Sequence, residues 1–225
     1  MVTNDDHASI CAFCAEANSR EQFNAYHNLD ILPTDDYSYI LEETSRFVVI
    51  PCIGPLTDNY VLIVPKRHVL SMGWLTAEEL TEVETLTQRW SHLVAGPQES
   101  ALILEHGSLS FRDKGGACCD HAHLHIVGSS VSLDTVRSQL SEHIRLSHQD
   151  DWSDSVRDFI QSRSRSYVLL RSGEDCWIGD AHGAPPQFFR KALCLALGLD
   201  EGAWDWLLYP RRDAVRAMIA RYAAH

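Results

Sequence analysis

Three histidines stand at every second position in the run His121-Ala-His123-Leu-His125-Ile-Val127. Side chains of a β-strand alternate between its two faces, so this spacing predicts a strand at 121–127 with all three imidazoles on one face. A core strand with a polar face of histidine is costly unless each ring has a partner, so chemistry is favoured over an ordinary exposed strand. The residues alone leave two kinds of chemistry open. Either the histidines bind a catalytic metal, or one of them is a nucleophile.

A second group of metal-binding residue types lies near the start of the chain. Cys11 and Cys14 form a CxxC pair, a spacing that suits two thiolates on one zinc ion. The chain has seven cysteines, so chance can also produce this spacing, and both interpretations stay open here. A tetrahedral zinc needs two further ligands. His68, at the end of Val64-Pro65-Lys66-Arg67-His68, follows a buried strand and is well placed to supply one.

Short strands and two helices are expected to position these groups. Segments rich in β-branched and aromatic residues predict strands at 37–42, 46–50, 60–64, 101–105 and 121–127. Thr76 and Glu79 have the capping-box spacing and begin a helix with apolar residues at helical spacing through Val94. Gly96-Pro97 is expected to end it. A second helix is expected at 136–144.

This order of elements, with short links, predicts an α+β fold in which an antiparallel sheet has helices packed on one side. We expect this catalytic domain to span residues 1–146. Polar composition predicts a linker with one loose helix over 147–166. Residues 167–225 are expected to form an α/β extension packed on the catalytic domain. Its predicted elements are a hairpin (167–171 with 176–178), a helix from Pro185-Pro186 to Gly198, and a helix at 213–222.

Charge and composition exclude several classes of function. The formal net charge is −12 over 225 residues, which disfavours binding to a nucleic acid backbone. The longest apolar runs fall far short of the ~20 residues that a membrane span needs. The first ten residues contain no apolar block that would indicate a secretory signal. We therefore expect a cytoplasmic protein with reduced thiols, without a nucleic acid or membrane partner.

The motifs together resemble a known family. The run 121–127 matches the motif H-φ-H-φ-H-φ-φ of the histidine triad superfamily at every position, and 60–69 resembles the strand and PKRH corner of the same family. Residues 47–68 also look like the galactose-1-phosphate uridylyltransferase branch. The resemblance covers about residues 11–130. Gln187 to Arg190 and Trp204 to Trp206 are similar, less specifically, to extensions in longer members.

The resemblance implies a role for each group. Zinc-bearing members use a CxxC, the PKRH histidine and the first triad histidine as ligands, which here are Cys11, Cys14, His68 and His121. With all four positions taken, the zinc would be structural. His123 would be the nucleophile that attacks phosphorus and carries a nucleotidyl intermediate, with a backbone carbonyl holding its other nitrogen. His125 would bind and orient the phosphate.

Several positions depart from the family pattern. Pro51-Cys52 stands where small members have a ribose-binding Asp, and Cys118 stands where a serine often contacts the phosphate. Glu105-His106-Gly107 replaces a family Asn, with His106 favoured as an ordinary loop histidine. The uridylyltransferase pattern H-P-H-G-Q is absent, which disfavours sugar-1-phosphate uridylyl transfer. Our candidate substrate-binding residues are Cys52, Gly116, Cys118, Gln187 and Arg190. Gly115 and Gly116 either bring N–H groups to a phosphate or form a plain turn.

Three hypotheses follow. The first is a nucleotide hydrolase or nucleotidyltransferase that works through His123 on a small nucleotide, with a purine favoured. The second is a metallohydrolase with a catalytic metal on the triad histidines. The third is a nucleotide-binding protein of this fold without activity. A homodimer stays open as the assembly.

Overall fold

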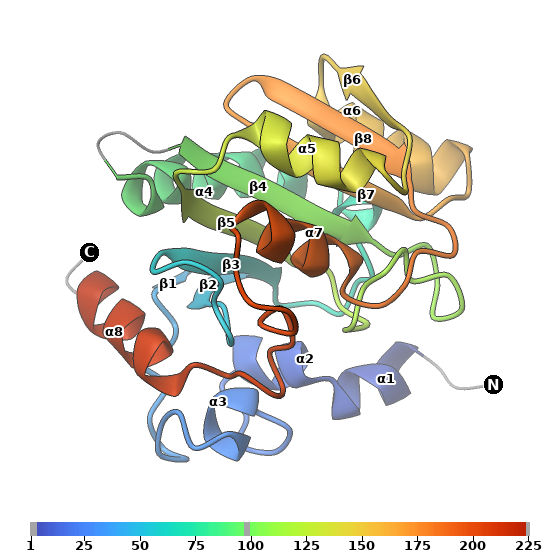
Figure 1. Ribbon diagram of the computed structural model, residues 1–225. Helices are drawn as coiled ribbons and strands as arrows, with labels where there is room; N and C mark the ends of the chain where they lie inside the picture. Colours follow the sequence, from blue (N-terminus) through green and yellow to red (C-terminus); the bar gives the residue numbers. More distant parts are fainter. Residues whose placement is uncertain (1–3, 97–99, 224–225) are drawn as a thin grey trace.

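One antiparallel sheet organises the protein. The computed structural model describes residues 4–96 and 100–223, and within them the sheet has eight strands in the order β1-β2-β3-β5-β4-β7-β8-β6 (Figure 1). The strands are β1 (Glu42–Glu43), β2 (Phe47–Pro51), β3 (Tyr60–Pro65), β4 (Ser100–Gly107), β5 (Leu124–Ser129), β6 (Leu146–Gln149), β7 (Tyr167–Ser172) and β8 (Asp175–Asp180). All residues of β2, β3 and β5 are buried, as their apolar sequences require. The predicted α+β class with an antiparallel sheet is confirmed.

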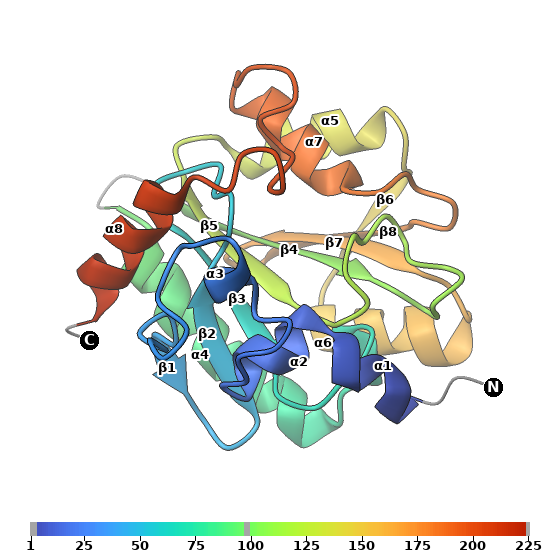
Figure 2. The ribbon, with the colours of Figure 1, turned by 90° about the horizontal axis from the view of Figure 1, so that it is seen from below.

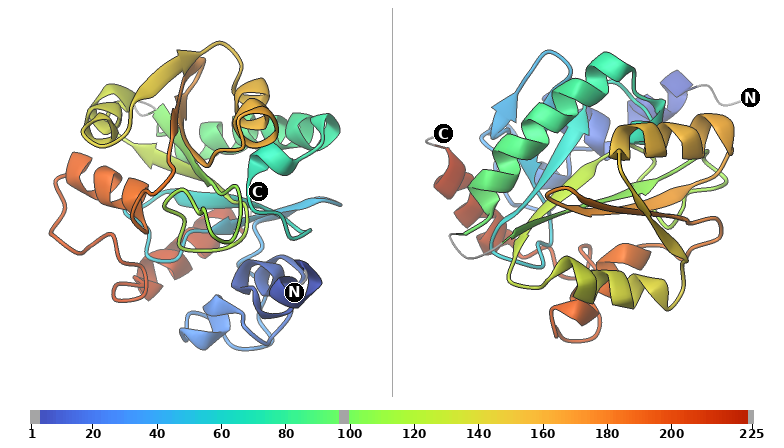
Figure 3. Two further views of the ribbon diagram at one scale, coloured as in Figure 1. Left: turned by 90° about the vertical axis from the view of Figure 1, so that its right-hand side faces the viewer. Right: turned by 90° about the horizontal axis from the view of Figure 1, so that it is seen from above.

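Helices cover both faces of this sheet. Helices α4 (Ala77–Val94) and α6 (Trp152–Arg157) lie on one face, and α5 (Leu133–Ser141) and α7 (Phe188–Ala196) lie on the other (Figures 2 and 3). The expected helices on one side of the sheet are α4 and α6, and the opposite face is covered as well, by α5 and by α7 of the C-terminal segment. The predicted capping box of α4 is present, and its apolar stripe is buried. Pro97, expected to end this helix, lies outside the described residues.

The remaining helices flank the sheet. They are α1 (Asn4–Ile10), α2 (Ala12–Ala17), α3 (Ala25–Asn28), the 3₁₀ turn η1 (Met72–Trp74), the π-helical turn η2 (Asp158–Ser162) and α8 (Arg212–Tyr222). None of the helices in the described residues combines the length and apolar character that crossing a membrane requires.

Two strand predictions need correction. The triad strand begins only at Leu124, because β5 pairs with β3 and that pairing runs out at Ile63, just before β3 ends. His121 and His123 therefore precede the strand. The strand expected at 37–42 is reduced to β1. Its aromatic Tyr39 packs inward instead, stacked on Tyr26 with ring centroids 4.1 Å apart.

The C-terminal segment continues the same sheet. Strand β7 pairs with β4, and β7 and β8 form the expected hairpin. Strand β6, α6 and η2 occupy most of the segment expected to be a linker, and β6 pairs with β8. The boundary expected at residues 146 and 147 falls within β6. The division into a catalytic domain, a linker and an extension stays a proposal.

Candidate functional site

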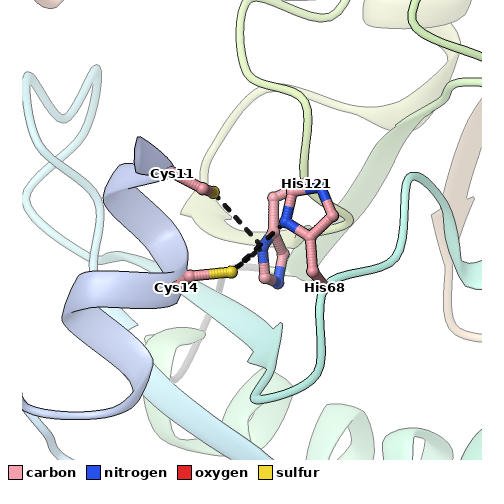
Figure 4. Close-up of side chains that lie close together, drawn as sticks. All are labelled: Cys11, Cys14, His68 and His121. Atoms are coloured by element: carbon pink, nitrogen blue, oxygen red, sulfur yellow. Dashed lines mark hydrogen bonds between the residues drawn. The ribbon is translucent and has the colours of Figure 1, made fainter. Parts of the chain in front are cut away.

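Four metal-binding side chains converge beside the start of β5. Cys11, Cys14, His68 and His121 each offer one ligand atom, and these atoms all lie within 4.8 Å of one another (Figure 4). The Sγ of Cys14 lies 3.2 Å from Nδ1 of His68 and 3.4 Å from Nδ1 of His121. The Sγ of Cys11 lies 3.5 Å from the same His121 nitrogen. Tetrahedral zinc with Zn–S bonds of about 2.3 Å and Zn–N bonds of about 2.0 Å places its ligand atoms roughly 3.3–3.8 Å apart. The four residues therefore fit a tetrahedral metal ion.

Local structure explains why these side chains meet. Cys11 is the N-cap of α2 and Cys14 lies one turn later, so both thiols point to the same side of the helix. His68 follows the end of β3, and His121 approaches from the loop before β5. The Nε2 atom of His121 donates to the carbonyl oxygen of Pro65 at 2.8 Å, which leaves Nδ1 as the nitrogen that faces the cysteines.

A hydrogen bond between the two thiols separates their proton affinities. The Cys14 thiol donates to the sulfur of Cys11 and lowers the pKa of Cys11, whereas the same bond and burial raise the pKa of Cys14. A thiolate is the form that binds a metal. The cluster therefore favours Cys11 as a thiolate, and Cys14 would release its proton when a metal binds.

His123 has one ring nitrogen fixed and the other available. Its Nδ1 lies 2.8 Å from the carbonyl oxygen of His121. A carbonyl oxygen only accepts, so Nδ1 carries the proton and the neutral ring has a bare Nε2. This Nε2 makes no hydrogen bond within the described residues. Burial lowers the pKa of His123 to about 4, although the bond to the carbonyl acts in the opposite direction. The arrangement presents an imidazole lone pair at the pocket described below.

His125 is held by a tyrosine. Its Nδ1 lies 2.9 Å from the Oη of Tyr60, across the neighbouring strand β3. Its Nε2 is buried and has no hydrogen-bond partner within the described residues. The ring is 4% exposed, and the His123 ring lies beside it with centroids 4.6 Å apart. A buried polar atom without a partner is costly, so a ligand atom is the expected partner of Nε2.

A mostly apolar pocket lies over His123 and His125. It is lined by Ala12, Phe13, Glu16, Ala25, Tyr26, Ile50, Pro51, Cys52, Ile53, Leu62, Cys118, Cys119, His123, His125, Arg190 and Trp206. Most of these residues are apolar, as in a site for a flat organic ring with a few polar groups at one end. The candidate residues Cys52, Cys118 and Arg190 line this pocket together with the two histidines.

Arg190 brings a buried positive charge to the pocket. It comes from α7 and is 4% exposed. Its guanidinium donates to the carbonyl oxygens of Trp204 at 2.9 Å and Gly54 at 2.6 Å, and to the Sγ of Cys52 at 3.4 Å. Within the part of the chain that the structure describes, no carboxylate forms an ion pair with it. A buried cation without a counter-ion is unfavourable, so the pocket is prepared for an anion.

Comparisons with known proteins show limited similarity over part of the chain. No family model matches the chain. Among curated proteins, adenosine 5′-monophosphoramidase HINT3 of Danio rerio is 26% identical over 99 residues, which cover 44% of this chain. The chain spans 61% of the length of that relative. The chain resembles the histidine triad superfamily. This confirms the resemblance predicted from the sequence, while similarity to galactose-1-phosphate uridylyltransferase stays a prediction.

Several solved structures are also similar to the chain, at low sequence identity. A Zn-bound histidine triad family protein from Mycobacterium smegmatis matches with 18% identity and a TM-score of 0.40, over 70% of this chain and 94% of that one. Yeast Ap4A phosphorylase Apa2 in complex with AMP matches with 15% identity and a TM-score of 0.41, over 75% of this chain and 74% of that one. A HIT family hydrolase from Clostridium thermocellum matches with 22% identity and a TM-score of 0.35, over 53% of this chain and 90% of that one.

Two candidate residues of this histidine triad-like chain lie outside the pocket lining. The carbonyl oxygen of Gly116 accepts from the backbone N–H of Gln187 at 2.8 Å, so the loop before the triad is tied to the start of α7. The side-chain Oε1 of Gln187 is buried and has no hydrogen-bond partner within the described residues. Gly115 and Gly116 both have positive φ angles, of 55° and 84°, which explains the two glycines. A substrate contact at Gly116 or Gln187 stays a prediction.

Sequence reasoning missed three polar residues beside the triad histidines. Tyr60 was assigned only to a strand, although it lies close in register to His125. His106, favoured as a loop histidine, is a buried residue of β4 whose Nδ1 donates to the carbonyl oxygen of Gly115 at 3.1 Å. Burial lowers its pKa to about 3. Glu16 supplies a carboxyl group to the pocket, where its Oε1 accepts from the backbone N–H of Ala25. The alternation of β4 could have indicated His106, but no sequence signal indicated Glu16.

Proposed function

We propose that the protein is a nucleotide hydrolase or nucleotidyltransferase in which His123 attacks the α-phosphorus and forms a covalent nucleotidyl-histidine. One observation carries this proposal. The hydrogen bond from Nδ1 of His123 to the carbonyl oxygen of His121 gives the neutral ring an unprotonated Nε2 that can act as a nucleophile. A neutral imidazole can approach an anionic phosphate without charge repulsion.

The proposed reaction has two displacements. In the first, the Nε2 lone pair of His123 forms a bond to the α-phosphorus, and the bond to the leaving group breaks with its electron pair on the leaving group. In the second, water or another acceptor attacks the same phosphorus, and the P–N bond breaks with its electrons returning to His123. The acceptor's proton leaves to solvent or to the departing group. Arg190 and the Nε2–H of His125 would stabilise the negative charge on the phosphoryl oxygens.

Similarity and chemistry both support a nucleotide substrate. The relative from Danio rerio is named as an adenosine 5′-monophosphoramidase, so a purine nucleoside monophosphate derivative is the first substrate to test. The apolar lining of the pocket suits a base, and Arg190 suits a phosphate. A purine base, a homodimer and a cytoplasmic location stay predictions.

We further propose a structural zinc ion held by Cys11, Cys14, His68 and His121. Zinc would supply a fixed double positive charge that links α2 to the loop before β5. All four protein ligands fill a tetrahedral shell, so substrate would have no open coordination position. Among the described residues, side chains able to hold a metal gather in a group of three or more only at this cluster. The catalytic-metal alternative is therefore disfavoured, because His123 and His125 are not part of this group.

A rapid-quench experiment tests the proposed intermediate. The protein is mixed with excess adenosine 5′-phosphoramidate, quenched in base within milliseconds to seconds, and examined by intact-protein mass spectrometry. We expect an added adenylyl group that maps to His123 and is released by acid. His123→Ala is the control and should acquire no label. Turnover without any label on His123, or a label on another residue, would overturn the proposal.

A further inference from the structure

Two adjacent cysteines take part in neither displacement of the proposed reaction, although one of them, Cys118, is a candidate substrate contact. Cys118 and Cys119 lie in the loop before the triad, and their Sγ atoms are 3.6 Å apart. Cys118 is exposed and Cys119 is partly exposed. Of the other five cysteines, two belong to the metal cluster and three are buried: Cys52, Cys176 and Cys194. Within the described residues, Cys118 and Cys119 are therefore the two accessible thiols outside the proposed zinc site.

Both thiols line the same pocket as His123. A small reagent that enters this pocket meets the two sulfur atoms and the proposed nucleophile together. The side chains of neighbouring residues along an extended chain usually point apart. Here the turn brings both sulfur atoms to one side. The sulfur atoms must approach from 3.6 Å to about 2.05 Å to form a bond, which side-chain rotation and a small backbone adjustment can supply.

We propose that Cys118 and Cys119 form a reversible oxidation site that takes a hydroperoxide and closes to a vicinal disulfide. The Cys118 thiolate attacks one oxygen of the hydroperoxide, the O–O bond breaks, and the other oxygen leaves as hydroxide or alkoxide. Cys118 is then a sulfenic acid. The sulfur of the Cys119 thiol attacks this sulfur, an S–S bond forms, and the hydroxyl takes up the thiol proton and leaves as water. The two thiols lose two electrons and two protons, and the peroxide is reduced.

The geometry also explains why the bond would be reversible. Consecutive Cα atoms are about 3.8 Å apart, whereas disulfides usually join Cα atoms about 4.4–6.8 Å apart. A disulfide between neighbours is therefore strained, and strained disulfides are more easily reduced by thiols. Reduction by a dithiol would restore the pair.

Closure would act on the catalytic group through a short stretch of chain. His121 follows Cys119 by two residues, and its carbonyl oxygen orients His123. The intervening Asp120 forms an ion pair with Lys114 at 2.7 Å, and the backbone N–H of Ala122 donates to Val69. These two contacts hold the side chain of Asp120 and the backbone of Ala122 in place. A backbone adjustment at Cys119 would therefore fall on the residue between them and shift the carbonyl of His121. Oxidised protein should lose nucleotide turnover, a readout that rests on the proposed function.

The test uses the whole 225-residue chain, loaded with zinc, and needs no substrate. The protein is treated with hydrogen peroxide and then with an alkylating reagent. Intact mass should fall by about 2 Da before alkylation, for the two hydrogens lost. The tryptic peptide 115–137 contains both cysteines and no other, so it should carry the bond as a cyclised, unalkylated peptide. Dithiothreitol should restore both alkylation sites.

Matched variants decide between possible partners. Cys119→Ser should stop at a sulfenic acid on Cys118 that dimedone traps, without loss of 2 Da. Cys52→Ser should still close the 118–119 bond. A disulfide between Cys118 and Cys52, or one between Cys11 and Cys14 with release of zinc, would overturn the proposal. If the 118–119 bond forms but the reduced protein turns over no nucleotide, the proposed function is wrong and the proposed oxidation site is still supported.

Discussion

The Nδ1 atom of His123 donates to the carbonyl oxygen of His121 at 2.8 Å, so one peptide group connects the proposed nucleophile to a proposed metal ligand. The side chain of His121 lies beside Cys11 and Cys14. Two histidines separated by one residue therefore have different surroundings, and substitutions at the two positions should have different effects.

His121→Ala should lose metal affinity and stability. Metal binding contributes to the free energy of folding, so the loss could reach several kcal/mol. His123→Ala should retain its zinc and melt near wild type, because its ring binds no metal. Its turnover should fall by more than the ~10²–10⁴-fold typical of removing a general acid or base, since the covalent route is lost.

Elemental analysis, thermal melting and turnover of both variants make this comparison. Wild-type protein purified without chelator should contain one zinc per chain. Loss of metal from His123→Ala would favour the catalytic-metal alternative. Wild-type protein without zinc would contradict the structural-zinc proposal.

Tyr60→Phe should weaken catalysis while leaving the fold intact. The phenol oxygen is the partner of Nδ1 of His125, and without it the ring loses its orientation. Leaving a buried polar atom without a partner costs about 1–3 kcal/mol, which corresponds to roughly a 5- to 150-fold loss of turnover. Tyr222→Phe is the matched control, because this buried tyrosine donates to Asn59 instead. Equal turnover of the two variants would show that Tyr60 does not position His125.

Arg190→Met should weaken the binding of AMP much more than that of adenosine. Truncating one partner of a buried charge pair costs about 2–5 kcal/mol, so affinity for AMP should fall about 30-fold or more. Arg190→Lys keeps the charge and should recover part of the affinity. Isothermal titration calorimetry with both ligands measures the difference.

Arg171→Met controls for the loss of a buried arginine. Arg171 pairs with Glu84 at 2.8 Å and lies outside the pocket, so its variant should bind AMP normally. If Arg190→Met weakens adenosine and AMP equally, the guanidinium holds α7 in place and does not bind the phosphate.

The sequence indicated the CxxC pair and the triad histidines because their spacing is local, and the family resemblance added His68 and His121 as proposed metal ligands. Cys11 and Cys14 share a helical turn, and the triad histidines occupy every second position from 121 to 125. It did not indicate Tyr60 as the partner of His125, because this pairing depends on the register of β3 against β5. Nor could it show that α7 returns across the sheet to place Arg190 over the pocket. Both facts are properties of tertiary packing, which a single sequence specifies only through long-range contacts.

The β7–β8 hairpin was predicted from its own residues, but not its attachment to β4. An extension with an alternating pattern can pair with an existing edge strand or form a separate sheet. The alternation fixes which face of a strand is buried and says nothing about its neighbour. Glu105 was not predicted to titrate unusually for the same reason, because its partners Met72 and Tyr167 are distant in the sequence.

Glu105 should make the stability of the protein depend on pH. Its carboxyl group is fully buried on β4, with Oε1 accepting from the backbone N–H of Met72 at 2.7 Å and Oε2 accepting from the hydroxyl of Tyr167 at 2.5 Å. Burial raises its pKa from 4.5 to about 7, although both hydrogen bonds act in the opposite direction. Between these two pH values the unfolded chain has released this proton and the folded chain retains it. The free energy of unfolding should therefore fall as pH rises from about 4.5 to about 7, by up to about 3 kcal/mol from this group.

Urea unfolding of the wild type and of Glu105→Gln between pH 5 and pH 8 tests this expectation. The amide cannot ionise, so the stability of Glu105→Gln relative to wild type should increase with pH and level off above about pH 7. Effects of pH on the metal cluster are common to both proteins and cancel in the difference. Glu84→Gln is the control: burial would raise the pKa of Glu84, but the ion pair with Arg171 lowers it. Its contribution is lost only in acid, so its difference from wild type should stay constant over this range. If the difference in stability between Glu105→Gln and wild type is also constant, Glu105 is ionised in the folded protein over the whole range. The hydrogen bonds from Met72 and Tyr167 would then lower its pKa by more than burial raises it.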